Sequence, residues 1–439
     1  MSAHSEGSAS AAWPAAVRLL TRWLDQGERV DALLDTLPAS LKGPERARCQ
    51  NLVLGVVRHF RRIETPLSRI VAHPPRFLTR AILFVAGYEL IEAAGTPASE
   101  GRVAKIVHHA VEQTKVIASP AEARLVNAVV RKLAAALPGE APAAGADAEA
   151  LAEYFSHPVW LVKSWLAQFG PQATRSLLEW NQQPAPVYAR WRAAGEAVPA
   201  FLQPTRWPGF FEVATGHWAE VEPLLKAGKL YLQDPSTRVP VELLAPQAGE
   251  AVLDLCAAPG GKSLLIADAL QTGRLVAVDL PIDPAKPGPR IERLRDNLSR
   301  AGAVEVALVQ AAVEEGLGPV LREHQLPEAY PAVLLDVPCS NTGVMRHRVD
   351  VKWRLQQGDF NKHPQQQLAL LHAAARLVAP GGRLVYSTCS IDGAENENVI
   401  REFFASRAGE AFTREKSILS FPWVDGHDGG GAILLRKKL

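Results

Sequence analysis

Apolar residues in the first third of the chain recur at the spacing of an α-helix. Between residues 12 and 137 they stand three and four positions apart, which places them on one face of a helix. Two such stretches contain Leu52, Val53, Val56, Val57, Phe60 and Ile63, and Val103, Ile106, Val107, Ala110 and Val111. No segment of this region that is long enough for a β-strand shows the alternation of apolar and polar residues that a strand requires. The pattern predicts an all-helical domain over residues 1–138.

A change of composition marks the end of this domain. Residues 134–150 read AAALPGEAPAAGADAEA, and such a mixture of Ala, Pro, Gly and acidic residues without apolar periodicity is typical of a linker. Residues 150–230 are rich in tryptophan and interrupted by proline. We predict that they form a small connecting region that packs against the domain that follows.

From about residue 231 the pattern alternates between short apolar strands and helix-length stretches. The predicted strands are 251–255, 274–278, 304–309, 332–335 and 383–387. This alternation predicts an α/β domain over residues 231–439, with a parallel sheet covered on both faces. In such sheets a ligand binds beyond the carboxyl ends of the strands, so candidate site residues belong there.

The composition is that of an ordinary globular protein, with 439 residues, 47% of them hydrophobic and 21% charged. The longest apolar run, residues 81–94, is too short to span a bilayer and contains Glu89 and Glu92. The first residues lack the basic start and apolar core of a signal peptide. Four cysteines are too few for a disulfide framework. These features predict a cytoplasmic protein that does not bind a membrane.

The charge is distributed unevenly along the chain. Residues 1–138 hold 18 Lys and Arg and 12 Asp and Glu, whereas the remainder holds 30 and 34. A basic N-terminal segment in an otherwise near-neutral chain suits the binding of a polyanion such as a nucleic acid. A surplus this small is equally compatible with a solvated, arginine-rich surface.

The first two predicted strands end in residues that suit a nucleoside. The first runs through Asp254 into CAAPGGK at residues 256–262, where small residues allow a ligand to lie against backbone N–H groups. The second ends at Asp279, whose two carboxylate oxygens can accept both hydroxyls of a ribose. This pair predicts a nucleoside-containing cofactor. The segment differs from the G-x-G-x-x-G pattern of a dinucleotide site, which disfavours NAD.

Three of the four cysteines follow predicted strands. Cys256 follows the first, Cys339 lies in DVPCSNTG after the fourth, and Cys389 lies in YSTCS at the end of the fifth. A free cysteine is usually a small buried apolar residue, but that does not explain three at one edge of a sheet. Zinc is disfavoured because no C-x-x-C spacing occurs and no histidine stands within three residues of these cysteines. We therefore expect no metal.

Together, CAAPGGK, DVPCSNTG and YSTCS resemble motifs I, IV and VI of the Sun (Nop/Sun) family of RNA cytosine-5 methyltransferases. Residues 12–133 resemble the RNA-binding NusB-like domain, through QNLVLGVVR and LVNAVVRKL. The resemblance implies an all-α NusB-like domain followed by a Rossmann-like, class I S-adenosylmethionine methyltransferase domain with a mixed, mostly parallel seven-stranded sheet. It also implies RNA as the substrate, 16S ribosomal RNA in particular, with residues 150–230 assisting RNA binding. Nothing in the sequence requires a dimer, so a monomer is expected.

The resemblance also implies roles for individual residues. Cys389 matches the nucleophile of the family, and Cys339 matches the second cysteine, which assists release of the product. Lys262 either orients Asp336 and the substrate or only neutralises nearby carboxylates. S-Adenosylmethionine is expected to be held by Cys256, Ala257, Ala258, Pro259, Gly260, Gly261, Lys262, Asp279 and Asp336.

The chemistry of this reaction calls for such residues. C5 of cytosine is a poor nucleophile, and a thiolate that adds at C6 turns the ring into an enamine with electron density at C5. Methyl transfer, loss of the C5 proton and expulsion of the thiolate follow, so the group must be both a strong nucleophile and a good leaving group. Addition is easier when N3 is protonated, and our hypothesis for the proton donor is Asp336. The base has to leave its stack or come from single-stranded RNA to reach Cys389.

Some positions depart from the family pattern. Ala312 stands where an acidic residue that contacts the cofactor is usual, with Glu314 as the candidate substitute. Residues 281–289 resemble an insertion, and Asn341 replaces a small residue. Three basic residues follow the fourth motif: Arg346, His347 and Arg348. They either contact RNA phosphates or form a solvated loop. The change at Ala312 leaves open a function of another class, a catalytically weak RNA-binding ribosome-assembly factor that keeps the fold.

Overall fold

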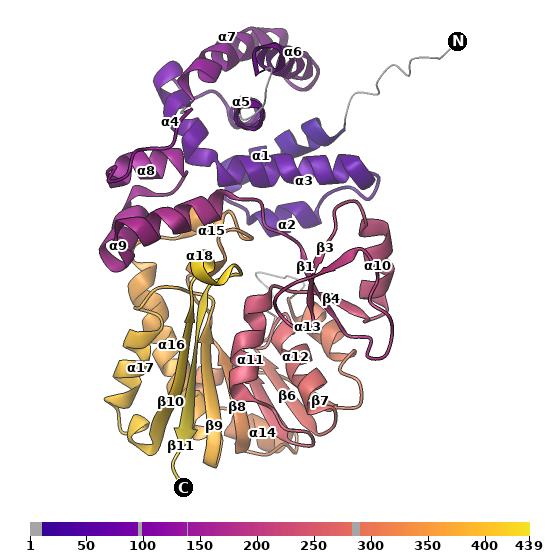
Figure 1. The fold of residues 1–439 in the computed structure, drawn as a ribbon, viewed down its shortest axis with the longest axis vertical. Helices are drawn as coiled ribbons and strands as arrows, with labels where there is room; N and C mark the ends of the chain where they lie inside the picture. The colour runs from indigo at the N-terminus through magenta and orange to yellow at the C-terminus, as the bar shows by residue number, and fades with distance from the viewer. Residues whose placement is uncertain (1–10, 95–98, 138, 283–289) are drawn as a thin grey trace. The chain divides into compact units, whose positions relative to one another are not determined.

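The computed structural model describes residues 11–94, 99–137, 139–282 and 290–439 (Figure 1). The chain forms two compact units: one holds the chain up to Pro184 together with Met345–Leu355, and the other holds Ala185–Val344 and Gln356–Leu439. The predicted division at residues 138, 150 and 231 stays a prediction. Apart from its first two residues, the insertion expected at 281–289 lies outside the described residues.

The first unit is helical throughout its described part, as the apolar spacing predicts. Its helices are α1 (Ala12–Gln26), α2 (Val30–Asp35), α3 (Gly43–Arg58), α4 (Phe60–Ile70), α5 (Phe77–Ala94), α6 (Ser99–Ile117), α7 (Pro120–Ala136), α8 (Ala148–Tyr154), α9 (Val159–Gln182) and α15 (Val351–Arg354). None of the described helices has the length and apolar character needed to cross a bilayer.

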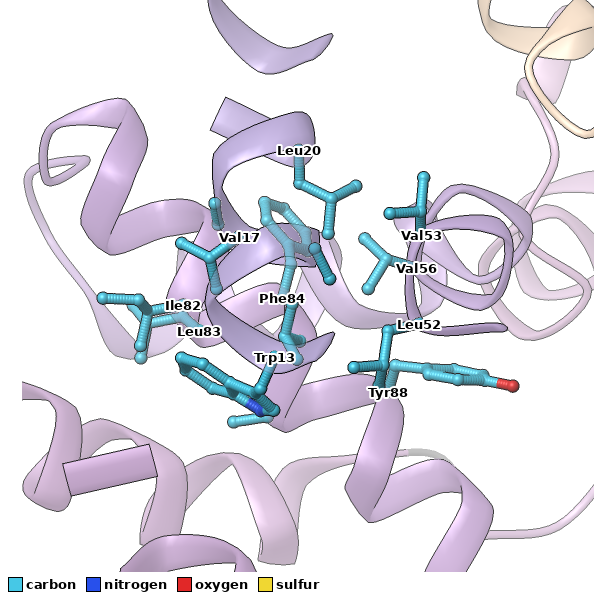
Figure 2. Close-up of a cluster of buried hydrophobic side chains, with 14 of the residues drawn as sticks. Trp13, Val17, Leu20, Leu52, Val53, Val56, Ile82, Leu83, Phe84 and Tyr88 are labelled. Carbon is cyan, nitrogen blue, oxygen red and sulfur yellow. The ribbon is translucent and has the colours of Figure 1, made fainter. Parts of the chain in front are cut away.

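Helix α5 forms the centre of this unit because it is apolar on nearly all sides. Figure 2 shows Phe84 of α5 between side chains of α1, such as Leu20, and side chains of α3, such as Val56. Helices α3 and α5 approach so closely at Gly55 that a Cβ there would lie 2.1 Å from Cζ of Tyr88. A larger residue at this position would displace the ring of Tyr88.

The segment Met345–Leu355 packs into the helical unit although it directly follows the fourth motif in the chain. Lys352 Nζ donates to the carbonyl oxygen of Arg58 at 2.9 Å, and Trp353 Nε1 donates to that of Val57 at 2.7 Å. Asp350 Oδ2 accepts the backbone N–H of Val30 at 3.2 Å. Burial lowers the pKa of Lys352 well below its ordinary value. These buried contacts attach the segment Met345–Leu355 to the helical unit.

The second unit contains a seven-stranded sheet in the order β10-β11-β9-β8-β5-β6-β7. Its strands are β5 (Ala251–Leu255), β6 (Arg274–Asp279), β7 (Glu305–Gln310), β8 (Tyr330–Asp336), β9 (Val378–Thr388), β10 (Phe412–Ser420) and β11 (Gly430–Lys437). Strands β5 to β9 are parallel, and β11 runs antiparallel to both β9 and β10. The mixed, mostly parallel sheet is therefore confirmed, and all five strands predicted from the pattern are present.

Helices cover both faces of this sheet. Successive residues of β5 alternate between the two cores, because Val252 belongs to one and Leu253 to the other. One face packs against α11 (Arg238–Leu244), α12 (Gly261–Leu270) and α13 (Arg290–Leu298), and the other against α14 (Gly318–Glu323), α16 (Asp359–Arg376) and α17 (Glu397–Phe404). Short helical turns are η1 (Pro235–Thr237), η2 (Val313–Glu315), η3 (Thr342–Val344), η4 (Gly409–Ala411) and α18 (Pro422–Asp425).

A small antiparallel sheet precedes the large one in the same unit. It has the order β2-β3-β1-β4, with β1 (Tyr188–Trp191), β2 (Leu202–Pro204), β3 (Phe210–Val213), β4 (Leu230–Leu232) and helix α10 (Trp218–Lys226). Strands of three or four residues leave too short an alternation to be recognised in the sequence. This part of the expected connecting region is therefore a folded sheet that belongs to the second unit.

Candidate active site

Strand β5 carries a buried carboxylate that the sequence analysis did not single out. Asp254 is 1% exposed, and its Oδ2 accepts the hydroxyl of Ser263 at 2.5 Å. Its Oδ1 is buried and has no hydrogen-bond partner among the described residues. Burial raises the pKa of Asp254 to about 7. A buried acceptor without a partner is costly, so Asp254 is suited to a ligand that brings a donor. Its signal in the sequence is an acid inside the apolar strand AVLDL.

Asp279 holds the turn that follows β5. Its Oδ2 accepts the N–H of Ala258 at 2.7 Å and Nη2 of Arg290 at 2.9 Å, while its Oδ1 accepts the N–H of Leu280 at 2.8 Å. A carboxylate offers about four acceptor positions. Three are taken by the protein, so Asp279 can accept both hydroxyls of a ribose only if one protein donor withdraws, and the side chain of Arg290 is the one that can move.

The two glycines of CAAPGGK lie close to other side chains of the protein. Gly260 has a φ of 102°, and a Cβ there would lie 3.0 Å from Cδ1 of Leu294. A Cβ on Gly261 would lie 3.0 Å from Nε2 of Gln233. Side chains, and not open space, therefore face both Cβ positions. The expected contact between these glycines and a cofactor stays a prediction.

Cys256 begins this turn but is unsuited to act as a nucleophile. Burial, together with the negative charges of Asp279 and Asp336, raises the pKa of its thiol far above the ordinary value. The group therefore remains a neutral thiol, which is a weak nucleophile. This separates Cys256 chemically from the other two cysteines at the edge of the sheet.

Lys262 and Asp336 form an ion pair at the carboxyl end of β8. Lys262 Nζ lies 2.7 Å from Asp336 Oδ2, and the hydroxyl of Ser387 donates to Oδ1 at 3.0 Å. Burial alone would lower the pKa of Lys262, but the charge and the hydrogen bond of Asp336 outweigh it and leave the pKa raised. The ammonium stays charged and fixes the carboxylate, which is the contact required if Lys262 orients Asp336.

The sulfur atoms of Cys339 and Cys389 lie 2.8 Å apart, although the residues are 50 positions apart in the chain. Cys339 is 7% exposed. The hydrogen bond with Cys389, burial and the charge of Glu395 raise the pKa of Cys339 well above its ordinary value. Cys339 therefore remains a neutral thiol, and Cys389, which is partly exposed, is the better placed nucleophile.

Asn341 contacts both cysteines. Its Nδ2 donates to the carbonyl oxygen of Cys339 at 2.8 Å, and its Oδ1 accepts the thiol of Cys389 at 3.2 Å. Its backbone has a φ of 62°, a left-handed conformation that asparagine adopts more readily than most residues. The departure from a small residue at this position thus places an amide against the candidate nucleophile.

Two family models and several relatives match the sequence of the chain. The family described as 16S rRNA methyltransferase RsmB/F matches residues 241–419, and the NusB family matches residues 11–135. The ribosomal RNA small subunit methyltransferase B of Sodalis glossinidius is 32% identical over 404 residues, which are 89% of this chain and 88% of that protein. The chain belongs to the RsmB/F family. The resemblance to RNA methyltransferases and to a NusB-like domain is thereby confirmed.

A second relative is similar in sequence, and two solved structures are similar in fold. The protein of the same name from Klebsiella pneumoniae is 30% identical over 405 residues, 89% of this chain and 88% of its own. The crystal structure of PH0851 has the same fold, with a TM-score of 0.74, 22% identity, and coverage of 97% of this chain and 99% of that one. NSun6 from Pyrococcus horikoshii shares the fold of part of the chain, with a TM-score of 0.53, 18% identity, and coverage of 64% and 98%. The chain is an RNA methyltransferase of this family.

Glu314 and one of the basic residues after the fourth motif make contacts within the protein. Glu314, the candidate substitute for the acid missing at Ala312, is exposed and accepts Nε2 of Gln366 at 3.4 Å. Arg346 belongs to the helical unit, where its guanidinium lies 4.2 Å from the ring centroid of Trp180 and donates to the carbonyl oxygen of Pro184. Arg348 is exposed. Of the predicted basic trio, Arg346 thus has a packing role.

Proposed function

We propose that the protein transfers a methyl group from S-adenosylmethionine to C5 of a cytosine in RNA, and that this RNA is 16S ribosomal RNA. The transfer proceeds through a covalent bond between Cys389 Sγ and C6 of the base. The observation that carries the proposal is the meeting of two thiols at 2.8 Å beside a Lys–Asp ion pair at the carboxyl ends of β8 and β9. The names of the relatives support the choice of RNA.

The residues at the carboxyl ends of β5, β6 and β8 fit the cofactor. S-Adenosylmethionine supplies a methyl group on a sulfonium when it is bound. Residues 256–262, Asp279 and Asp336 would hold it, and the buried, unpartnered Oδ1 of Asp254 offers an acceptor to its ammonium group. The proposed set of cofactor residues thus gains Asp254.

Each polar residue near the two sulfurs has a task in this reaction. Cys389 adds to C6, and the Lys262–Asp336 pair faces the N3 edge of the base. Because the ammonium of Lys262 lies against the carboxylate of Asp336, Lys262 supplies the proton that N3 takes and Asp336 relays it. After methyl transfer a water molecule from solvent takes the C5 proton, the electrons of the C5–H bond restore the C5–C6 double bond, and Cys389 leaves C6 as a thiolate. The N3 proton returns to the Lys262–Asp336 pair, and Cys339 assists the release.

The proposal is tested by treating 16S ribosomal RNA from cells that lack the protein. Incubation with purified protein and S-adenosylmethionine should make one cytosine resistant to bisulfite, because a methyl group at C5 slows deamination. Methylation that leaves every cytosine sensitive to bisulfite would place the methyl group on another atom or base, and would contradict the cytosine-5 assignment.

Replacing Asp279 with asparagine should weaken binding of S-adenosylmethionine. The change removes charge from an acceptor that we assign to the ribose, and a hydrogen bond to a charged group contributes about 1.5–3 kcal/mol, so the dissociation constant should rise about 10- to 100-fold. Calorimetric titration measures this, with Asp296→Asn as the control because that exposed carboxylate pairs with Arg300, just after α13. Absence of binding to the unaltered protein at millimolar cofactor would favour the assembly-factor alternative.

The helical unit is proposed to anchor RNA through exposed basic residues. On α7, Arg124, Arg131 and Lys132 are exposed. Changing all three to glutamine should weaken RNA binding and lower the slope of log affinity against log salt by about 0.7–0.9 for each phosphate that the variant no longer neutralises. The matched control changes Arg322, Arg407 and Lys438 to glutamine, which are exposed near the opposite edge of the large sheet from the active site. Equal effects of both triple variants would contradict an anchor on α7.

A further inference from the structure

Two adjacent polar residues, Glu395 and Asn396, are completely buried in the second unit. Both are 0% exposed, and they lie just before α17 in the segment AENEN, which no motif used above contains. Buried polar groups need hydrogen-bond partners inside the protein. In this case the partners are the residues that flank the two cysteines of the active site.

Glu395 holds both sides of Cys339. Its Oε2 accepts the backbone N–H of Ser340 at 2.9 Å, and its Oε1 accepts the hydroxyl of the same residue. On the other side, Gln367 Nε2 donates both to Glu395 Oε2 at 2.8 Å and to the carbonyl oxygen of Pro338 at 3.0 Å. The backbone before and after Cys339 is therefore fastened to one carboxylate–amide pair.

Glu395 also reaches the loop of the other cysteine. Its Oε1 accepts the hydroxyl of Ser390, the residue after Cys389, at 2.8 Å. The hydroxyls of Ser340 and Ser390 lie 3.2 Å apart. With the amide of Gln367, the carboxylate receives four hydrogen bonds, which is about the capacity of an ionised carboxylate. One side chain thus joins the two loops.

Asn396 holds both sides of Cys389. Its Oδ1 accepts the hydroxyl of Thr388 at 2.8 Å, and its Nδ2 donates to the carbonyl oxygen of Ser390 at 2.9 Å. The amide is held by a third hydrogen bond, because its Nδ2 also donates to the carbonyl oxygen of Asp392 at 2.9 Å. Gly431 of β11 leaves the space that the amide oxygen occupies, because a Cβ there would lie 2.0 Å from Oδ1 of Asn396.

We propose that Glu395 and Asn396 are positioning residues. Glu395 acts mainly on Cys339, because three of its four hydrogen bonds hold the residues around that cysteine, and Asn396 sets the place of Cys389. Their adjacency in the chain fixes one sulfur relative to the other. The inference rests on the proposed function, in which Cys389 forms the bond to C6 and Cys339 acts at release. A displacement of about 1 Å at a reacting group can cost about 100-fold in rate, so small shifts of either loop matter.

The two residues should therefore affect different steps. Glu395→Gln keeps the shape of the side chain but replaces acceptor sites with a donor, and it should slow release of the covalent adduct about 10- to 100-fold. Asn396→Ala should slow formation of the adduct by a similar factor. Binding of S-adenosylmethionine should stay within about twofold of the unaltered protein in both variants, because neither residue belongs to the proposed cofactor set.

Two transcripts of 16S ribosomal RNA separate the steps in rapid-quench experiments with S-adenosylmethionine. With 5-fluorocytosine in the transcript, the adduct cannot lose the substituent at C5, so its appearance on a denaturing gel measures formation alone. With ordinary cytosine, the decay of the adduct measures release. Glu250→Gln is the matched control, because this half-buried carboxylate pairs with Arg383 in the first half of β9, away from the cysteine that follows this strand.

Milder variants keep the test decisive if the first two fail to fold. Ser340→Ala removes one hydroxyl bond to Glu395 and should slow only release, whereas Thr388→Val removes the hydroxyl bond to Asn396 and should slow only formation. If each variant slows both steps equally, or if neither differs from Glu250→Gln, the positioning roles are wrong. If the unaltered protein forms no adduct with the 5-fluorocytosine transcript, the proposed function itself fails.

Discussion

Cys389→Ala is expected to abolish methyl transfer to RNA, with a loss of at least about 10⁴-fold, because no other group that we assign to the site can form the bond to C6. Cys256 remains protonated by burial, and Cys339 lies deeper in the protein with a raised pKa. Transfer of a radioactive methyl group from S-adenosylmethionine to 16S ribosomal RNA measures the loss. RNA affinity should change little, since a thiol contributes little to the binding of a polyanion.

Cys49→Ala is the matched control for this variant. Cys49 is also a free thiol, but it is buried in α3 of the helical unit, and burial raises its pKa to about 11. Methyl transfer by Cys49→Ala should stay close to that of the unaltered protein. Retained turnover in Cys389→Ala would show that another group is the nucleophile.

Cys339→Ala is expected to trap the protein on its RNA. The adduct with Cys389 can still form, but the group that assists release is missing, so a covalent complex should accumulate in place of free product. A denaturing gel should show a slowly migrating band that disappears after treatment with ribonuclease. In the double variant Cys339→Ala/Cys389→Ala the band should be absent. A Cys339→Ala variant that turns over normally and forms no band would remove the release role.

The sequence predicts those helices and strands whose apolar residues form a clear pattern. Helix α5 is apolar on nearly all sides, and β5 to β8 are short apolar strands between helices, so periodicity alone identifies them. The candidate residues Asp279, Asp336, Cys339 and Cys389 were also found, because each lies at or just after the carboxyl end of a strand. Their positions at the ends of predicted strands are the reason why they could be predicted as site residues.

Contacts between distant segments could not be predicted in the same way. The strands of the small sheet, such as β2 (Leu202–Pro204), are too short to show alternation. The insertion of Trp353 beside Phe60 in the helical core depends on tertiary packing, and the tryptophan stands in a polar stretch of sequence. Glu395 and Asn396 have the composition of a solvated loop, yet both are buried because the cysteine loops supply their partners.

The glycine turn has close neighbours that the sequence does not predict. The sequence assigns Gly260 and Gly261 to the approach of a ligand, which stays a prediction, and the structure also places Leu294 and Gln233 near their Cβ positions. A glycine needed for close packing of protein against protein has the same sequence signature as one needed for a ligand. Only the three-dimensional neighbours distinguish the two.

Mapping the covalent bond in the adduct of Cys339→Ala tests the central claim most directly. The gel-purified complex is digested with protease and ribonuclease, and mass spectrometry locates the peptide that carries the added nucleotide. The account predicts one modified cysteine, residue 389, bearing a cytidine nucleotide that already contains the transferred methyl group. A nucleotide attached at Cys256, or at any residue other than Cys389, would contradict it.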